Sequence, residues 1–288
     1  MARPRLVTLT TDIGGVYAAQ MKAVLYRRLP PGHVIDLVHD VPPHRVVEAA
    51  FLLRQMGAMF PAGTVHVAVI DPGVGSTRAP IAVKCADTSL LVGPDNGVLF
   101  PLAERLGGGD AYRLDPARVA PGHPPSPTFQ GRDLFAPAAA RLACGTPPER
   151  LGTRCDFQHR ALPVPRRRGR TVRGVVLHVD PFGNLITNVP GEWLPAPGTP
   201  LSVRVGRGTP RPVMRARTYA DLAPRALGSL VSSFGTVEVS ARESSAARRL
   251  GGRFGTAVVL RRPRSRGGPG PRPPVGGARA RRSASTRR

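Results

Sequence analysis

Short apolar runs alternate with amphipathic ones through the first half of the chain. Four runs rich in Val, Ile, Leu and Thr end in acids or in Gly/Asn turns, which is typical of strands. Between them, apolar residues recur every three or four positions, which predicts helices. Such alternation indicates an α/β fold with a mainly parallel sheet. The expected strands cover residues 5–12, 33–40, 64–71 and 89–97, and the expected helices cover residues 16–29, 45–60 and 131–143.

The pattern changes beyond residue 160. A Pro- and Arg-rich stretch interrupts it, and strand-like segments with little helix follow, which predicts a small all-β domain and suggests a barrel. We therefore expect an N-terminal α/β domain over residues 1–160, a linker over 161–172 and a smaller C-terminal β-barrel domain over 173–260.

Positive charge is concentrated at the C-terminus. The chain has a net charge of +24, and residues 261–288 hold ten Arg, five Pro, five Gly and no acid. This tail cannot bury apolar surface, so we expect it to be disordered. Two interpretations stay open: a solvated extension, or a segment that binds RNA, DNA or another polyanion. Forty of the 42 basic residues are Arg, which fits a high-GC coding bias as well as selection for phosphate contacts.

Several classes of protein find no support in the sequence. No apolar run approaches the 18 residues of a membrane span and no signal-peptide core is present, so we expect a cytoplasmic protein without membrane contact. The three Cys form no CxxC pair, and the sequence has no G-x-G-x-x-G, GKS/GKT or serine-elbow motif. We expect no metal and no cofactor. His66 and His178 fall inside strand patterns and are expected in the core or the strand ladder.

Polar residues follow the predicted strands of the first half. In an open parallel sheet, ligands bind beyond the carboxyl ends of the strands. Asp71 lies at such an end, and the Pro72–Gly73 turn with Gly75 allows the chain to fold back and bring Arg78 to the same place. The alternative is that Asp71 caps a turn and Arg78 is a solvated charge. The other polar strand ends are Asp12, Asp40, Asp95 and Asn96.

The second half contains one dense polar stretch, VDPFGNLITN. Asp180, Phe182 and Asn184 can offer a carboxylate, a stacking face and an amide to a heterocyclic ligand, although the same stretch also fits a common β-turn.

Six ordered segments carry a family resemblance. LTTDIGG, VIDPGVGSTR, VGPDNGV, PTFQGRDLFAPAAA, VDPFGNLITN and SSFGTVEVS resemble the S-adenosylmethionine hydroxide adenosyltransferases (S-adenosylmethionine hydrolases), relatives of the fluorinase and chlorinase enzymes. The resemblance covers about residues 5–260. It implies an N-terminal α/β domain, a C-terminal β-barrel and a homotrimer with sites between the N-domain of one subunit and the C-domain of its neighbour. It also implies attack of water on ribose C5′ of S-adenosylmethionine, giving adenosine and methionine without a cofactor.

The resemblance also assigns roles to residues. Asp71 and Arg78 match two members of the family's catalytic Asp-Arg-His set, but Gln130 stands where the family has His. A carboxamide can position water but cannot take its proton, so slow hydrolysis is expected. His123 is a candidate replacement base. Asp12 is expected to bind the ribose hydroxyls, Asn184 the adenine edge, and Asp180 and Ser233 the ligand from the neighbouring subunit, with Asn96, Phe182 and Glu238 as further substrate-binding candidates.

Two other functions stay open. A halide-dependent S-adenosylmethionine alkyl transferase needs no base, but the halogenating relatives lose the Asp/Arg loop that is intact here. A non-catalytic S-adenosylmethionine- or adenosine-binding protein is favoured by Gln130.

Overall fold

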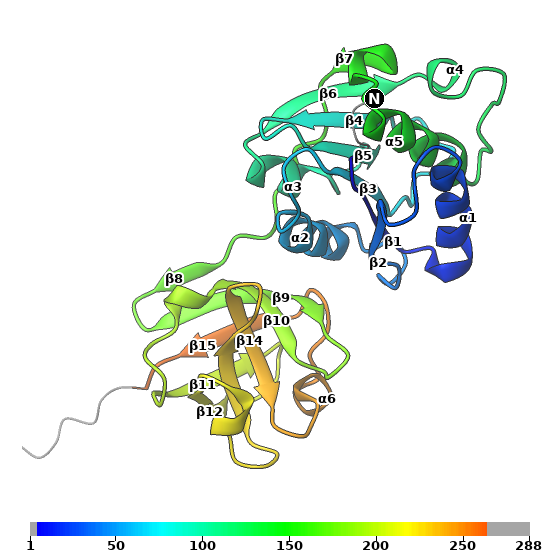
Figure 1. Ribbon diagram of the computed structural model, residues 1–288. Coiled ribbons are helices and arrows are strands. Elements are labelled where there is room, and N and C mark those ends of the chain that lie inside the picture. Colours follow the sequence, from blue (N-terminus) through cyan, green and yellow to red (C-terminus); the bar gives the residue numbers. More distant parts are fainter. Residues whose placement is uncertain (1–4, 264–288) are drawn as a thin grey trace, which may run out of the picture.

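A seven-stranded sheet forms the centre of the N-terminal domain (Figure 1). The computed structural model describes residues 5–263. The strands lie in the order β2-β1-β3-β5-β4-β6-β7, and β1, β3 and β5 are buried throughout. Their bounds are β1 (Val7–Thr11), β2 (Val34–Val38), β3 (Val65–Val69), β4 (Pro80–Cys85), β5 (Leu90–Pro94), β6 (Gly109–Leu114) and β7 (Gly152–Cys155).

The sheet has a parallel half and an antiparallel half. Pairs β2–β1, β1–β3 and β3–β5 are parallel, as the alternation with helices predicts, and this confirms the α/β class. Pairs β5–β4, β4–β6 and β6–β7 are antiparallel. The physical reason is visible between β4 and β5: only residues 86–89 join them, which is too short for the crossover that parallel neighbours need.

Helices cover both faces of this sheet. One face packs against α1 (Gly14–Tyr26) and α5 (Ala136–Ala143), and the other against α2 (Val46–Gly57) and α3 (Phe100–Arg105). A five-residue π-helix, η1 (Gly131–Phe135), leads directly into α5. Pro137 has no N–H to donate to the carbonyl of residue 133, and the wider helical turn occurs at this point. The remaining short helices are α4 (Pro116–Val119) and η2 (Pro148–Arg150).

A seven-stranded closed barrel forms the C-terminal domain and confirms the β-barrel expectation. The strands follow one another in the order β10-β14-β13-β12-β11-β15-β9, and β9 pairs with β10 to close the ring. Strand β8 (Arg166–Arg168) pairs with β9 from within the segment expected to be a linker. The other bounds are β9 (Thr171–Val179), β10 (Leu185–Pro190), β11 (Pro200–Val205), β12 (Arg211–Arg215), β13 (Leu227–Val231), β14 (Thr236–Ala241), β15 (Ala257–Arg261), η3 (Gly191–Trp193), η4 (Tyr219–Asp221) and α6 (Ala246–Leu250).

Some sequence expectations concern absences or the tail. Within residues 5–263, no helix is long and apolar enough to cross a membrane. The same residues contain no group of three His, Cys, Asp or Glu side chains placed to hold a metal ion. The expected disorder of the tail concerns residues that, from 264 onward, lie outside the described part of the chain.

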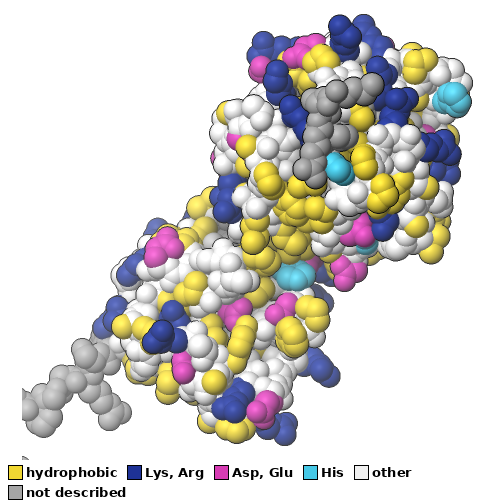
Figure 2. Space-filling view, viewed as in Figure 1, with side chains coloured by type: hydrophobic (Ala, Val, Ile, Leu, Met, Phe, Trp, Pro, Cys, Tyr) yellow, Lys and Arg dark blue, Asp and Glu magenta, His cyan; other side chains and the backbone are white. Residues whose placement is uncertain are grey.

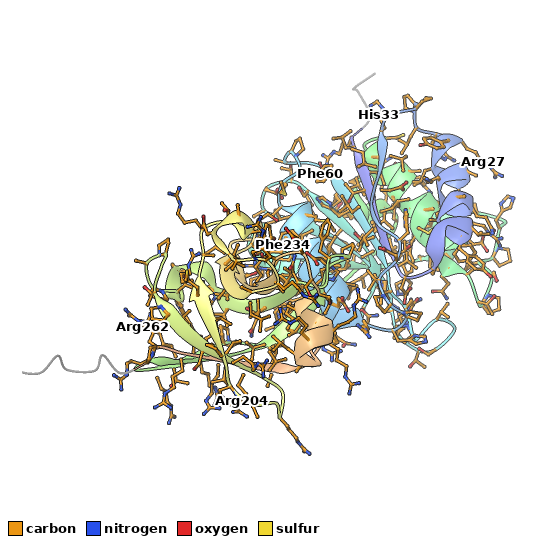
Figure 3. The ribbon with its side chains drawn as sticks, turned by 90° about the horizontal axis from the view of Figure 1, so that it is seen from below. Arg27, His33, Phe60, Arg204, Phe234 and Arg262 are labelled. Atoms are coloured by element: carbon orange, nitrogen blue, oxygen red, sulfur yellow. The ribbon has the colours of Figure 1, made fainter. Side chains whose placement is uncertain are left out.

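The two domains share an apolar contact on the α2 side of the sheet. Leu177 and Ile186 of the barrel pack into the same cluster as the residues of α2. The rings of Phe51 and Phe234 meet edge to face, with centroids 5.7 Å apart, where the domains adjoin (Figure 3).

A buried carboxylate lies in this contact. Glu48 of α2 is only 3% exposed, and its Oε1 lies 2.8 Å from His178 Nδ1 of the barrel. Its Oε2 accepts a hydrogen bond from Arg45 Nη1 at 3.0 Å. His, Asp and Glu side chains are visible at the junction of the two bodies in Figure 2. His178, expected in the strand ladder, therefore belongs to β9 by its backbone and to the domain contact by its side chain.

Replacing this carboxylate is expected to destabilise the protein. We predict that Glu48→Gln lowers the free energy of unfolding by about 2 kcal/mol, because two charge-assisted hydrogen bonds of a buried group are lost. Urea unfolding at pH 7 measures the change. The matched control is Glu243→Gln, since Glu243 is 64% exposed and pairs only with Arg242. Equal stability of both variants would contradict a structural role for Glu48.

His66 gives stability a pH dependence. It is 1% exposed, its Nδ1 lies 2.8 Å from Thr8 Oγ1, and burial lowers its pKa from 6.5 to about 4. The unfolded chain therefore binds a proton that the folded chain does not, and stability falls as the pH drops from 6.5 towards 4. We predict that this group accounts for about 3 kcal/mol of the loss. Urea unfolding at pH 7 and pH 4.5 should show a shallower pH dependence for His66→Gln, and an unchanged slope would refute the assignment.

Candidate active site

The parallel half of the sheet brings three predicted residues to one edge (Figure 1). Strands β1, β3 and β5 are neighbours, and Thr11 of β1 pairs in register with Val69 of β3. Asp12 follows β1 directly, whereas Asp71 and Asn96 each lie two residues beyond the end of their strand. The edge rule for parallel sheets therefore places these side chains in one row.

Asp71 and Arg78 form a bidentate ion pair. Arg78 Nε donates to Asp71 Oδ1 at 2.9 Å, and Arg78 Nη2 donates to Asp71 Oδ2. Both side chains are buried, with 9% of Arg78 and 7% of Asp71 exposed. Gly75 has a φ of +78°, and a Cβ on it would lie 3.0 Å from the carbonyl oxygen of Pro127. Glycine at this position thus allows the β3–β4 loop both to turn and to touch the segment that leads to Gln130.

Gln130 completes this cluster. It caps the N-terminus of the π-helix, and its Oε1 accepts a hydrogen bond from Arg78 Nη2 at 2.6 Å. The Arg78 guanidinium carbon lies 5.3 Å from the centroid of the Phe135 ring. Gly131 lets the helix approach β3, because a Cβ there would lie 3.3 Å from Val69 Cγ1. The structure therefore joins three predicted residues that are up to 59 positions apart in the sequence.

Arg78 retains unused hydrogen-bonding capacity. Its Nη1 is buried and has no hydrogen-bond partner among residues 5–263. His123, the candidate replacement base, does not supply one: it is exposed and its Nδ1 lies 3.0 Å from the Pro121 carbonyl oxygen. It lines a separate hollow of about 880 Å³ beside α1 and α5.

Asp12 is held from one side only. Its Oδ2 accepts from the backbone N–H of His44 at 2.9 Å, and Oδ1 has no hydrogen-bond partner among the described residues. His39 fixes the surrounding loop, since its Nδ1 lies 2.8 Å from Thr11 Oγ1 and its carbonyl accepts from Gly14 N–H. Sequence reasoning examined these two histidines only as metal ligands, and the register that brings β2 beside β1 was the signal for their actual position.

The other polar strand ends point elsewhere. Asn96 donates from Nδ2 to the Ile70 carbonyl at 2.8 Å and accepts from Val98 N–H at 3.2 Å, so its amide joins the end of β5 to the end of β3. The Asp95 carboxylate accepts from Gln158 N–H at 2.7 Å. Asp40 is exposed.

A second group of predicted residues meets in the barrel. Asp180, Ser233 and Glu238 line one cavity of about 490 Å³, together with His178 and Tyr219. Glu238 is 3% exposed and accepts a hydrogen bond from Ser240 at 2.9 Å. Burial and a hydrogen bond to Glu238 raise the pKa of Tyr219 above its usual range, so this phenol is protonated at neutral pH.

The VDPFGNLITN stretch is a turn organised by Asp180. Its Oδ1 accepts from the backbone N–H groups of Phe182 and Asn184, and its Oδ2 accepts from Asn184 Nδ2 at 2.8 Å. Asn184 is consequently buried, whereas the Phe182 ring is 79% exposed. The turn interpretation of this stretch is confirmed, and its carboxylate nevertheless faces the cavity.

Within one chain the two groups stay apart. No hydrogen bond or ion pair among residues 5–263 joins Asp12, Asp71, Arg78 or Gln130 to the barrel group. Large apolar side chains are exposed on each domain, including Val16 (76%) and Tyr17 (52%) at the start of α1 and Phe182 on the barrel. Each domain thus carries an incomplete set of polar groups beside exposed apolar surface.

Comparison with known proteins identifies relatives over nearly the whole described chain. Residues 7–152 match the family described as "SAM hydroxide adenosyltransferase N-terminal domain", and residues 174–259 match its C-terminal domain. Proteins named (R)-S-adenosyl-L-methionine hydrolase from Salinispora tropica and Thermus thermophilus are each 41% identical, covering 87% and 89% of this chain and 95% and 99% of their own length. A fluorinase from an Actinoplanes species is 26% identical over 64% of this chain and 71% of its own.

Solved structures agree with this assignment. An uncharacterized conserved protein from Thermotoga maritima superposes with a TM-score of 0.84 at 32% identity, covering 89% of this chain and 100% of that one. A conserved hypothetical protein from Thermus thermophilus gives a TM-score of 0.70 at 37% identity, covering 89% of this chain and 99% of that one.

Proposed function

Because this chain belongs to the SAM hydroxide adenosyltransferase family, we propose that it hydrolyses S-adenosylmethionine to adenosine and L-methionine. The observation that carries the proposal is the buried Asp71–Arg78 pair with Gln130 on the free edge of the guanidinium. The names of the 41%-identical relatives support the same substrate. Incubation with S-adenosylmethionine should release adenosine and methionine in equal amounts, and binding without release would instead favour a non-catalytic binding protein.

The chemistry asks little of the leaving group. When the C5′–sulfur bond breaks, the electron pair neutralises the sulfonium and methionine leaves as a neutral thioether, so no general acid is needed. The difficult step is to hold a water or hydroxide oxygen in line with C5′. Arg78 supplies a permanent, fixed positive charge that stabilises a hydroxide-like nucleophile. Asp71 keeps the guanidinium in place through both of its oxygens.

Gln130 sets the expected rate. Its carbonyl oxygen faces Arg78, and its amide nitrogen is not basic, so it can position the nucleophile but cannot remove a proton. General-base assistance is worth about 10²–10⁴-fold. We therefore propose that hydrolysis by this chain is slow compared with a relative that has His at this position.

The remaining predicted residues fit recognition of the substrate. The unpaired Oδ1 of Asp12 is available to a ribose hydroxyl. Asp180, Ser233 and Glu238 surround a cavity whose carboxylates suit the cationic methionine end. Phe182 offers a stacking face for adenine and Asn184 fixes the turn that presents it, while Asn96 acts through the strand ends that it joins.

We further propose that these two groups meet in a homotrimer. The N-domain group of one copy and the barrel group of a neighbour would together surround one substrate, covering the exposed side chains of Val16, Tyr17 and Phe182. A cytoplasmic location and polyanion binding by the basic tail stay predictions from the sequence.

Restoring a base at position 130 should raise the rate. We predict that Gln130→His increases adenosine release by about 10²-fold or more and introduces a pH dependence near 6.5, the unperturbed pKa of His. The assay is adenosine formation from S-adenosylmethionine across pH. Gln158→His, the same change at an exposed position, should behave as the wild type. An unchanged rate and pH profile in folded Gln130→His would show that position 130 is not at the nucleophile.

Mixing two inactive variants tests the shared site. We predict that Arg78→Ala and Asp180→Ala each lose most adenosine release, and that subunit exchange between them restores part of it. Random mixing leaves roughly a quarter of the sites with both groups intact, if each site draws on two copies. Each variant exchanged with itself is the control. Failure to recover activity after exchange has been verified would mean that both groups act within one chain.

A further inference from the structure

We propose that the edge of Arg78 beside Gln130 is a binding site for a small monoanion such as chloride. The observation behind this is a buried cationic nitrogen, Arg78 Nη1, without a hydrogen-bond partner in the described residues. A charged donor left unpaired in the interior is costly, so a ligand that can accept its hydrogens is favoured there.

Counting the donors of Arg78 defines the site. A guanidinium has five N–H groups and no acceptor. The Nε hydrogen and both Nη2 hydrogens are taken by the two Asp71 oxygens and by Gln130 Oε1. Both Nη1 hydrogens remain, and one of them points along the same edge of the guanidinium as the Nη2 hydrogen that Gln130 accepts.

Gln130 adds further donors at this edge. Because Arg78 can only donate, the carbonyl oxygen of Gln130 must be the end that faces it, which leaves the Nε2 amide group free. Nε2 has no hydrogen-bond partner within residues 5–263. The unused groups contributed by these two side chains are therefore all N–H donors.

A site made of donors discriminates between ligands. A water molecule brings two hydrogens of its own that need acceptors, and both oxygens of Asp71 are already engaged by Arg78. A halide carries lone pairs on every side and no hydrogens. The negative charge also interacts favourably with the guanidinium in a poorly hydrated setting, above the Phe135 ring. Since Nη1 is buried, only a small anion can reach it.

Chloride binding can be measured on the protein alone. The line width of ³⁵Cl NMR is followed during a titration, with sodium gluconate keeping the ionic strength constant. We expect saturable broadening for the wild type. Gln130→Glu, which is isosteric but negatively charged, should weaken the affinity at least tenfold, or about 1.4 kcal/mol. Gln130→Met, which keeps the length and removes the amide donors, should weaken it severalfold.

The control addresses the many other arginines of the chain. Gln158→Glu makes the same change of charge at an exposed position and should bind chloride like the wild type. Equal broadening in all four proteins would overturn the proposal, because the anion would then bind elsewhere. Absence of saturable broadening in the wild type would overturn it as well.

A kinetic measurement separates this site from the proposed reaction, on which only its consequence for catalysis rests. Chloride bound at Arg78 displaces the nucleophile, so it should lower adenosine release by the wild type in proportion to occupancy. Chloride binding without any adenosine formation would leave the anion site standing and refute hydrolysis. Adenosine formation that chloride neither slows nor accompanies with binding would refute the anion site and leave hydrolysis standing.

Discussion

The bidentate ion pair between Asp71 and Arg78 is the interaction on which the candidate site depends. Two charges that are more than nine-tenths buried are tolerable only when each satisfies the other. The pair joins the end of β3 to the far side of the β3–β4 loop, and through Gln130 it reaches the π-helix that begins α5. A single guanidinium thereby fixes three separate segments around one point.

The architecture explains why this point lies where it does. The parallel half of the sheet collects the ends of β1, β3 and β5 at one edge, and helices on both faces keep the strands buried. The barrel is fixed to the opposite side of the same domain by apolar packing and by the Glu48–His178 contact. This arrangement presents two polar groups on different domains, and their separation within one chain is what makes an interface between copies the natural place for a complete site.

Much of this followed from the sequence because it rests on local patterns. Strand ends with acids predicted Asp12 and Asp71, and the glycine-rich loop predicted the return of Arg78. The antiparallel strands β4, β6 and β7 were not foreseen, since they depend on short connections and on pairing between distant segments. The contact of Arg78 with Gln130, and that of Glu48 with His178, could not be derived from spacing either, because both join residues more than 50 positions apart. The resemblance to a family supplied the first of these and had no bearing on the second.

Isotope labelling tests the central claim of water-dependent cleavage at C5′ most directly. The protein is incubated with S-adenosylmethionine in H₂¹⁸O, and the adenosine is analysed by mass spectrometry with fragmentation of the ribose. Attack of solvent-derived oxygen at C5′, guided by Arg78, predicts one ¹⁸O atom in the 5′-hydroxyl group and none in methionine. Adenosine that carries no label at this position would contradict the account.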